Sequence, residues 1–283
     1  MPKPSRATHQ LESPDSFDVG RYLDGIVGLL GGTANVIMQL STPPVGYGVV
    51  ESRVDSGNVM LHPVKRLRTT VTYLSVALLG TDAERTAYRE AVDVSHRQVR
   101  STGSSPVRYN AFDPALQLWV AACLYWGAQD LHERMHGPVD EATADAFYRF
   151  SARMGTTLQM PEAMWPTDRN AFAEYWTTHL ANTSIDPTVR TYFDDLIDLR
   201  MLPRPARWTF GRVHRFFVTG LLPQHLRDEM GMTWTARDER ALDLILRTLG
   251  ATTSKLPSPV RAFPLNAYLL DLRIRRRLGL PLV

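Results

Sequence analysis

From about residue 19 onward, apolar residues recur every three to four positions, and strand-like alternation is hard to find. That period is typical of amphipathic α-helices, so the sequence predicts an all-α fold. No internal repeat is visible and no linker is long enough to separate two units, so we expect one helical domain over residues 19–283. Residues 1–18 are polar and contain prolines, and we expect a flexible N-terminal arm there. The predicted helices are residues 20–41, 64–79, 82–101, 113–135, 140–154, 168–182, 187–200, 209–220, 236–250 and 261–277.

Two helix starts carry a chemical signature. Thr81 and Glu84 have the spacing of a capping box, in which each side chain binds the backbone N–H of the other residue. Gly80 directly before them can end the preceding helix in a left-handed conformation. Asp113-Pro114 combines an N-cap with proline at the first helical position. These signals place helix ends near residues 80 and 113.

The composition restricts the functional classes. The chain has 283 residues, of which 44% are hydrophobic, enough for one large core. Its 32 basic and 29 acidic residues leave a net charge of +3, too small and too evenly spread to indicate nucleic-acid binding. The first residues lack the apolar core of a secretory signal, and the apolar runs are shorter than the roughly 18–20 residues of a membrane span. We therefore expect a soluble, cytoplasmic protein without an integral membrane segment.

The single cysteine, Cys123, lies in the apolar run LWVAACLYW. One cysteine excludes an intramolecular disulfide, which fits a reducing compartment. A thiolate haem ligand is one interpretation of Cys123. A small buried hydrophobe fits the surroundings better, since no charged residue nearby would lower the thiol pKa.

The segment RLRTTVTYLSVALLGTDAERTAYREAVDVSH, residues 66–96, is the most informative about function. His96 lies in the second of two predicted helices and shares a helix face with Val92 and Val99. An imidazole directed at an apolar interior can hold a haem iron. On position alone, a core histidine hydrogen-bonded to a backbone carbonyl is the better-supported alternative.

Several short motifs follow one another between residues 20 and 235. They are Gly31-Gly32 with Gln39 and Pro44-Val45, Arg66-x-x-x-Thr70 ten residues before Gly80, His96-x-x-Val99, Tyr109 to Asp113-Pro114 with Trp119-Val120, and MPEAMWPTDRNAFAEYW. In this order they resemble the motifs of the MpaB and rubber-oxygenase (latex-clearing) catalytic-domain family. Each motif is weak alone, and their shared order makes the similarity fairly specific.

The resemblance implies an all-helical fold with a globin-like core that holds haem b. His96 would be the proximal iron ligand, and Arg66 and Thr70 would support the cofactor pocket. Glu51 lies near the position of the family's general base. The implied activity is that of an oxygenase that uses dioxygen to attack an apolar small molecule, for instance by oxidative cleavage of an alkene or isoprenoid. A non-catalytic haem or oxygen-binding protein is the alternative.

Some positions depart from the family. Rubber oxygenases carry a lysine that can cap the distal side of the iron, and the equivalent position here is Thr69. The loop VDSGNVMLHP makes the placement of Glu51 loose, and polymer cleavage is not expected because no secretory signal is visible. Without the resemblance, the simpler interpretation is that Arg66 is a solvated cation and that the Thr70 hydroxyl hydrogen-bonds to the backbone of its own helix.

A competing motif, H-E-R-M-H, runs from His132 through Glu133 to His136 and matches the H-E-x-x-H pattern of zinc proteases. On a helix the two histidines lie one turn apart with the glutamate as base, so a zinc hydrolase is a further, less favoured alternative. Gly137 stops the helix there, and a third ligand could only be a distant carboxylate such as Glu162. An exposed polar helix end explains the motif more simply.

Two further features of the sequence remain, a pair of histidines and a group of arginines. His214 and His225 lie among aromatic and leucine residues and are weak candidates for iron ligation. Arg273, Arg276 and Arg277 give the last helix a cationic face, for which pairing with acids and solvent is favoured over lipid or nucleic acid.

Overall fold

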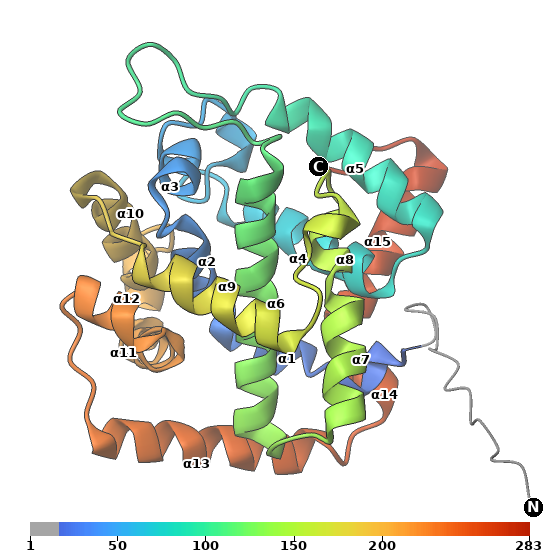
Figure 1. Cartoon of the computed structure of the whole chain (residues 1–283), viewed down its shortest axis with the longest axis vertical. Helices are drawn as coiled ribbons and strands as arrows, with labels where there is room; N and C mark the ends of the chain where they lie inside the picture. The colour runs from blue at the N-terminus through green and yellow to red at the C-terminus, as the bar shows by residue number, and fades with distance from the viewer. Residues whose placement is uncertain (1–16) are drawn as a thin grey trace, which may run out of the picture.

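The computed structural model describes residues 17–283, and within that range every regular element is helical, which confirms the predicted all-α class (Figure 1). The expected arm lies outside the described residues apart from Phe17 and Asp18. The elements are η2 (Val19–Tyr22), α1 (Gly25–Gly28), η3 (Leu29–Gly31), α2 (Gly32–Leu40), α3 (Pro43–Val50), η4 (Asp55–Gly57), α4 (Pro63–Leu79), α5 (Asp82–His96), α6 (Pro114–His136), α7 (Glu141–Ser151), α8 (Arg153–Thr156), η5 (Glu162–Met164), α9 (Arg169–Ala181), α10 (Pro187–Ile197), α11 (Arg204–Leu221), α12 (Gln224–Glu229), α13 (Ala236–Thr253), α14 (Ser258–Arg261) and α15 (Leu265–Leu278).

Helix α6 runs through the middle of the molecule, and α2, α8 and α13 pack against it (Figure 1). Trp119 on α6 is almost fully buried, and its indole N–H donates to the backbone oxygens of Met38 and Gln39 at 3.2 and 3.1 Å. In return, the Asn35 amide donates to the Cys123 carbonyl at 2.7 Å. These bonds fix α2 against the centre of α6, because buried polar groups must find partners.

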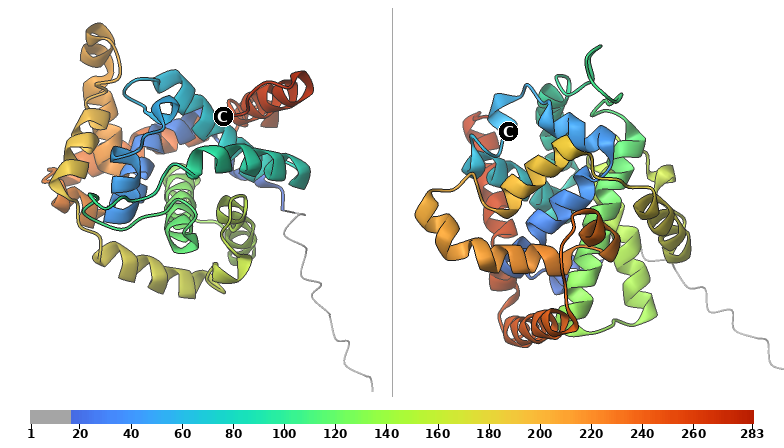
Figure 2. Two further views of the ribbon diagram at one scale, coloured as in Figure 1. Left: turned by 90° about the horizontal axis from the view of Figure 1, so that it is seen from above. Right: turned by 90° about the vertical axis from the view of Figure 1, so that its left-hand side faces the viewer.

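Helix α15 packs along α4 on the outside of the molecule (Figure 2). Arg273 on α15 binds Glu84 on α5 at 2.7 Å, and Arg275 binds Asp271 one turn earlier at 2.7 Å. The predicted pairing of the basic C-terminal helix with acids is thus confirmed for Arg273. The pair also connects α15 to the helix that carries His96.

The helix predicted over residues 20–41 is wrong in its first half. The chain forms η2, α1 and η3 there, and α2 begins only at Gly32. Glycines recur in this stretch and weaken a continuous helix. Gly25 also lies so close to the Phe263 carbonyl that a Cβ would sit 2.3 Å from its oxygen. The sequence reading also missed α3, whose prolines occupy the first turn, where they are compatible with a helix.

The capping predictions are confirmed, with one correction. The Thr81 hydroxyl and the Glu84 carboxylate form the reciprocal capping box, and Asp113 accepts from the backbone N–H of Ala115 at 2.9 Å. Gly80 is extended (φ −77°, ψ 151°) instead of left-handed, because the chain passes directly into the N-cap of α5.

Among the described residues, no single helix is long and apolar enough to cross a membrane. By length and composition alone, the pair Gly25–Leu40 and Pro43–Val50 would suffice together, but the two parts are bent by 111°.

Candidate functional site

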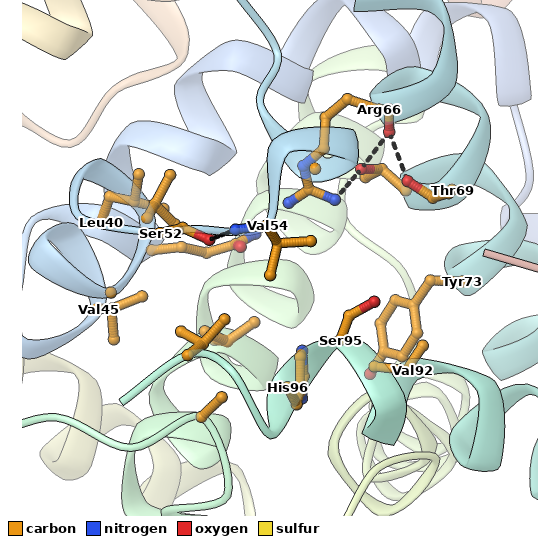
Figure 3. A pocket seen from close by; sticks show the side chains of 18 of the residues that line it. Leu40, Val45, Ser52, Val54, Arg66, Thr69, Tyr73, Val92, Ser95 and His96 are labelled. Carbon is orange, nitrogen blue, oxygen red and sulfur yellow. Dashed lines mark hydrogen bonds between the residues drawn. The ribbon is translucent and has the colours of Figure 1, made fainter. Parts of the chain in front are cut away.

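A cavity of about 440 Å³ opens between α3, α4, α5 and α6. Its size falls within the usual range of small-molecule sites, roughly 300–1,000 Å³. Most of the lining is apolar, with polar groups concentrated on α4 and the end of α5 (Figure 3). Apolar contacts come from Leu40, Val45, Val49, Val54, Met60, Leu74, Val92, Val99, Val120 and Leu124.

His96 is the last residue of α5, and contacts at the start and in the middle of that helix set its position. At the start, the capping box and the Arg273–Glu84 ion pair hold the first turn. Further along, the hydroxyl of Tyr88 donates to the Thr69 carbonyl on α4 at 2.6 Å. Tyr88 and His96 are two helical turns apart, so the same face of α5 that packs on α4 brings His96 to the cavity.

The His96 imidazole faces the cavity without being fully paired (Figure 3). Its Nδ1 is buried and has no hydrogen-bond partner, so the predicted alternative of a carbonyl-bonded core histidine is not what this nitrogen shows. Burial lowers the pKa of His96, which keeps the ring neutral near pH 7. A neutral imidazole is the form that binds a metal, and this one lines the cavity.

Arg66 and Thr70 also line the cavity, and Arg66 lies across it from His96 (Figure 3). A guanidinium nitrogen of Arg66 donates to the Thr70 hydroxyl at 3.0 Å, and that hydroxyl donates to the Arg66 carbonyl at 2.9 Å. Thr70 therefore bonds back to its own helix, as predicted, and also orients Arg66. Across the described part of the chain, no carboxylate lies within ion-pair distance of Arg66. Its charge is thus available to an anionic group.

Thr69 also lines the cavity. Its side chain is buried, and its hydroxyl donates to the Arg66 carbonyl at 3.0 Å. A threonine is too short to extend across the space and is already bonded to α4. The side of the cavity facing His96 therefore carries no strong ligand at this position.

Glu51 lies one side chain behind the cavity, not in its lining. Its carboxylate accepts from the hydroxyls of Ser105 at 2.7 Å and Tyr109 at 2.8 Å. Tyr109 itself lines the cavity, and burial, with the Glu51 hydrogen bond, raises its pKa. The structure thus brings His96, Arg66 and Thr70 to one space and connects Glu51 to it through a phenol.

Sequence reasoning missed three tyrosines of the lining, Tyr73, Tyr88 and Tyr192. The Tyr73 hydroxyl donates to the Met154 carbonyl, and burial raises the pKa of all three phenols. They therefore stay uncharged. The spacing Tyr88-Val92-His96, four residues at each step, was the available signal for the shared face on α5.

A second group of ligand-type residues lies at the other end of α6. His132 and His136 meet Asp24, and one donor atom from each lies within 4.8 Å of the others. The Asp24 carboxylate is 2.8 Å from Nε2 of His136, and burial and the nearby His136 lower the pKa of His132 to about 4. The expected third carboxylate, Glu162, is exposed on η5, whereas Asp24 comes from a loop with no local sequence signal for metal binding.

The remaining candidates have structural roles. Both His214 nitrogens are within 3.0 Å of partners, the Ile197 carbonyl and the Thr33 hydroxyl. His225 bonds the Thr183 carbonyl at 2.9 Å. Cys123 is fully buried, which raises the pKa of its thiol and confirms the small-hydrophobe interpretation.

The structure is an all-helical chain with a mostly apolar cavity that His96 lines. Residues 20–252 match the family described as ER-bound oxygenase mpaB/B'/Rubber oxygenase, catalytic domain, and the chain belongs to this family. It is 51% identical over 246 residues to Uncharacterized protein Rv2237 of Mycobacterium tuberculosis and to Uncharacterized protein Mb2261 of Mycobacterium bovis. Each alignment covers 87% of this chain and 96% of the relative. No solved structure matches it.

Proposed function

We propose that this protein is a haem-b-dependent oxygenase that acts on a hydrophobic small molecule, with an alkene or isoprenoid as the expected substrate type. The single observation that carries the proposal is the His96 imidazole, which lines an apolar cavity of about 440 Å³ and whose Nδ1 is not bonded to a backbone carbonyl. Membership of an oxygenase family supports the reaction class. The haem and the substrate are our inference.

The residues around the cavity fit haem b. His96 would be the axial ligand, the aliphatic side chains of α3 and α5 would contact the porphyrin, and Arg66 would pair with a propionate. Lys65, half-buried and also in the lining, is a second cation for the propionates. When bound, the haem iron supplies the binding and activation of dioxygen.

The protein's own groups would define the reaction space. Its aliphatic lining excludes water and favours an apolar substrate. The short, already bonded Thr69 leaves room opposite His96. Where a proton must leave the substrate, we propose Glu51 as the base that receives it through Tyr109. The phenol would accept the substrate proton while its own proton passes to the carboxylate 2.8 Å away.

Spectroscopy and oxygen uptake together test this function. Purified protein should show a Soret band with about one iron per chain, and apolar alkenes should shift that band and consume dioxygen. A protein with haem but without oxygen uptake across a panel of alkenes, isoprenoids and phenols would be a haem or oxygen-binding protein. A protein that incorporates no haem when expressed with sufficient iron and haem precursor would contradict the cofactor assignment.

A further inference from the structure

The second ligand group joins three segments far apart in the sequence. Asp24 lies between η2 and α1, His132 and His136 end α6, and Arg261 of α14 binds the other side of the Asp24 carboxylate at 3.3 Å. The Asp24 side chain is only 5% exposed, and that of His136 is 19% exposed. The side chains of Asp24 and His136 are thus mostly covered, while Glu133 and His136 as residues are exposed at the end of α6, as the sequence predicts.

The two histidines differ in how they are satisfied. His136 has Asp24 as its partner, which would suffice for a purely structural ion pair. His132 has no such explanation, because its Nδ1 is buried without a hydrogen-bond partner while its ring stacks on Tyr22 at 4.3 Å. An unpaired buried nitrogen costs free energy unless something binds it. The ring centroids of His132 and His136 are 4.8 Å apart, close enough for both imidazoles to bind one ion.

We propose that Asp24, His132 and His136 bind a divalent zinc ion that connects the segment before α1 to the end of α6. Two imidazoles and one carboxylate form a donor set that zinc accepts readily. Bonds of about 2.0–2.2 Å would hold the three donor atoms roughly 3.4 Å apart. The widest pair, at most 4.8 Å apart here, would have to close by up to about 1.4 Å. The Asp24 and His136 atoms, now 2.8 Å apart, would have to separate slightly. Arg261 would then orient the carboxylate, as outer partners of metal ligands commonly do.

The surroundings favour a structural role for this ion over hydrolysis. The space beside His132 and Glu133 is about 10 Å³, enough for about one water but not for a substrate. Glu133, the base of the protease pattern, accepts from Gln129 one turn back on α6 at 2.9 Å. The same donor set holds ferrous iron in some oxygenases, but it would have no organic substrate within reach here.

Zinc titration of the whole protein tests the site. Protein dialysed against a chelator is titrated with zinc chloride by calorimetry, and its melting temperature is measured with and without zinc. Wild type should bind one zinc per chain and melt at a higher temperature when loaded.

In His132→Phe, the ring remains to stack on Tyr22 while both nitrogens are lost. This variant and Asp24→Asn should bind zinc at least about 100-fold more weakly. His62→Ala removes a separate His–Asp pair, 3.0 Å from Asp55, and should bind zinc as wild type does.

Several outcomes would overturn the proposal. These are the absence of uptake by wild type at tens of micromolar zinc, a His132→Phe affinity within about threefold of wild type, and binding of ferrous iron in preference to zinc. Folding is checked independently, because a folded His132→Phe protein should keep its helical circular dichroism. The haem proposal stands apart from this test, since its Soret band depends on His96 and should be unchanged in His132→Phe.

Discussion

Among the described residues, His96 and His132 each have a buried Nδ1 without a hydrogen-bond partner, yet their surroundings differ. His96 stands alone beside about 440 Å³ of mostly apolar space, with Arg66 across from it (Figure 3). His132 has His136 and Asp24 as neighbours and a space of about 10 Å³. A free nitrogen marks both as possible ligands, but the space beside it separates a site for a cofactor and substrate from a site for an ion alone.

The largest expected effect comes from removing the imidazole at the cavity. His96→Ala should lower haem content from about one per chain to below about a tenth, because the proximal ligand is lost, and added imidazole should restore part of the Soret band. Pyridine haemochrome assay measures the content. His132→Phe is the matched control and should keep full haem. A His96→Ala protein with wild-type haem would erase the difference between the two histidines.

The next effect concerns the connection from Glu51 to the cavity. Glu51→Gln and Tyr109→Phe should each retain haem and lower turnover by on the order of 10²-fold, because either change interrupts the proposed proton path. Ser105→Ala removes the other hydrogen bond to the Glu51 carboxylate and should cost much less. Rates of oxygen uptake provide the measurement. Wild-type turnover in Glu51→Gln would remove that residue from the mechanism.

A smaller effect is expected on the opposite wall of the cavity. Arg66→Gln removes the charge proposed for a propionate and should weaken haem affinity about tenfold, corresponding to one charge-assisted hydrogen bond. Thr70→Val, which removes only the group that orients Arg66, should have less effect. Haem transfer to apomyoglobin gives the relative affinities. Unchanged transfer rates for Arg66→Gln would favour the alternative interpretation, in which Arg66 is a solvated cation that does not contact haem.

Helical period and capping residues were sufficient to predict the fold class and most helix ends, because these signals are local. Thr81 with Glu84 and Asp113 with Pro114 act through their own backbone neighbours. The broken stretch before Gly32 could not be predicted, since Gly25 is selected by contact with Phe263, far away in the chain.

The candidate sites show the same division between residues with a local sequence signal and residues without one. His96 could be proposed from its helix face and the family motifs, whereas Asp24 had no local signal that placed it beside H-E-R-M-H. Glu51 was placed near the right region, but only the fold shows that its carboxylate faces Tyr109 and Ser105. Contacts between distant segments decide such details, and a single sequence does not record them.

The smallest effect tests whether the helix that carries His96 is anchored independently of the cavity. Hydrogen bonding from Arg273 lowers the pKa of the Glu84 carboxyl from its usual value of 4.5. The unfolded chain therefore takes up this proton at a higher pH than the folded protein does. Stability from the pair is present above pH 4.5 and is lost as the pH falls through the lower folded value.

Glu84→Gln should accordingly lower the free energy of unfolding by about 1 kcal/mol at pH 7, a modest figure because the Arg273 side chain is 45% exposed and partly screened. The deficit relative to wild type should shrink as the pH falls below 4, because wild type then loses the same charge. Urea unfolding at a series of pH values measures both. Haem content should stay at the wild-type level, since Tyr88 still fixes α5 against α4. Loss of haem in Glu84→Gln, as in His96→Ala, would contradict this independence. Haem binding at His96 would then depend on the whole of α5, including its capping box, and not only on the residues that line the cavity.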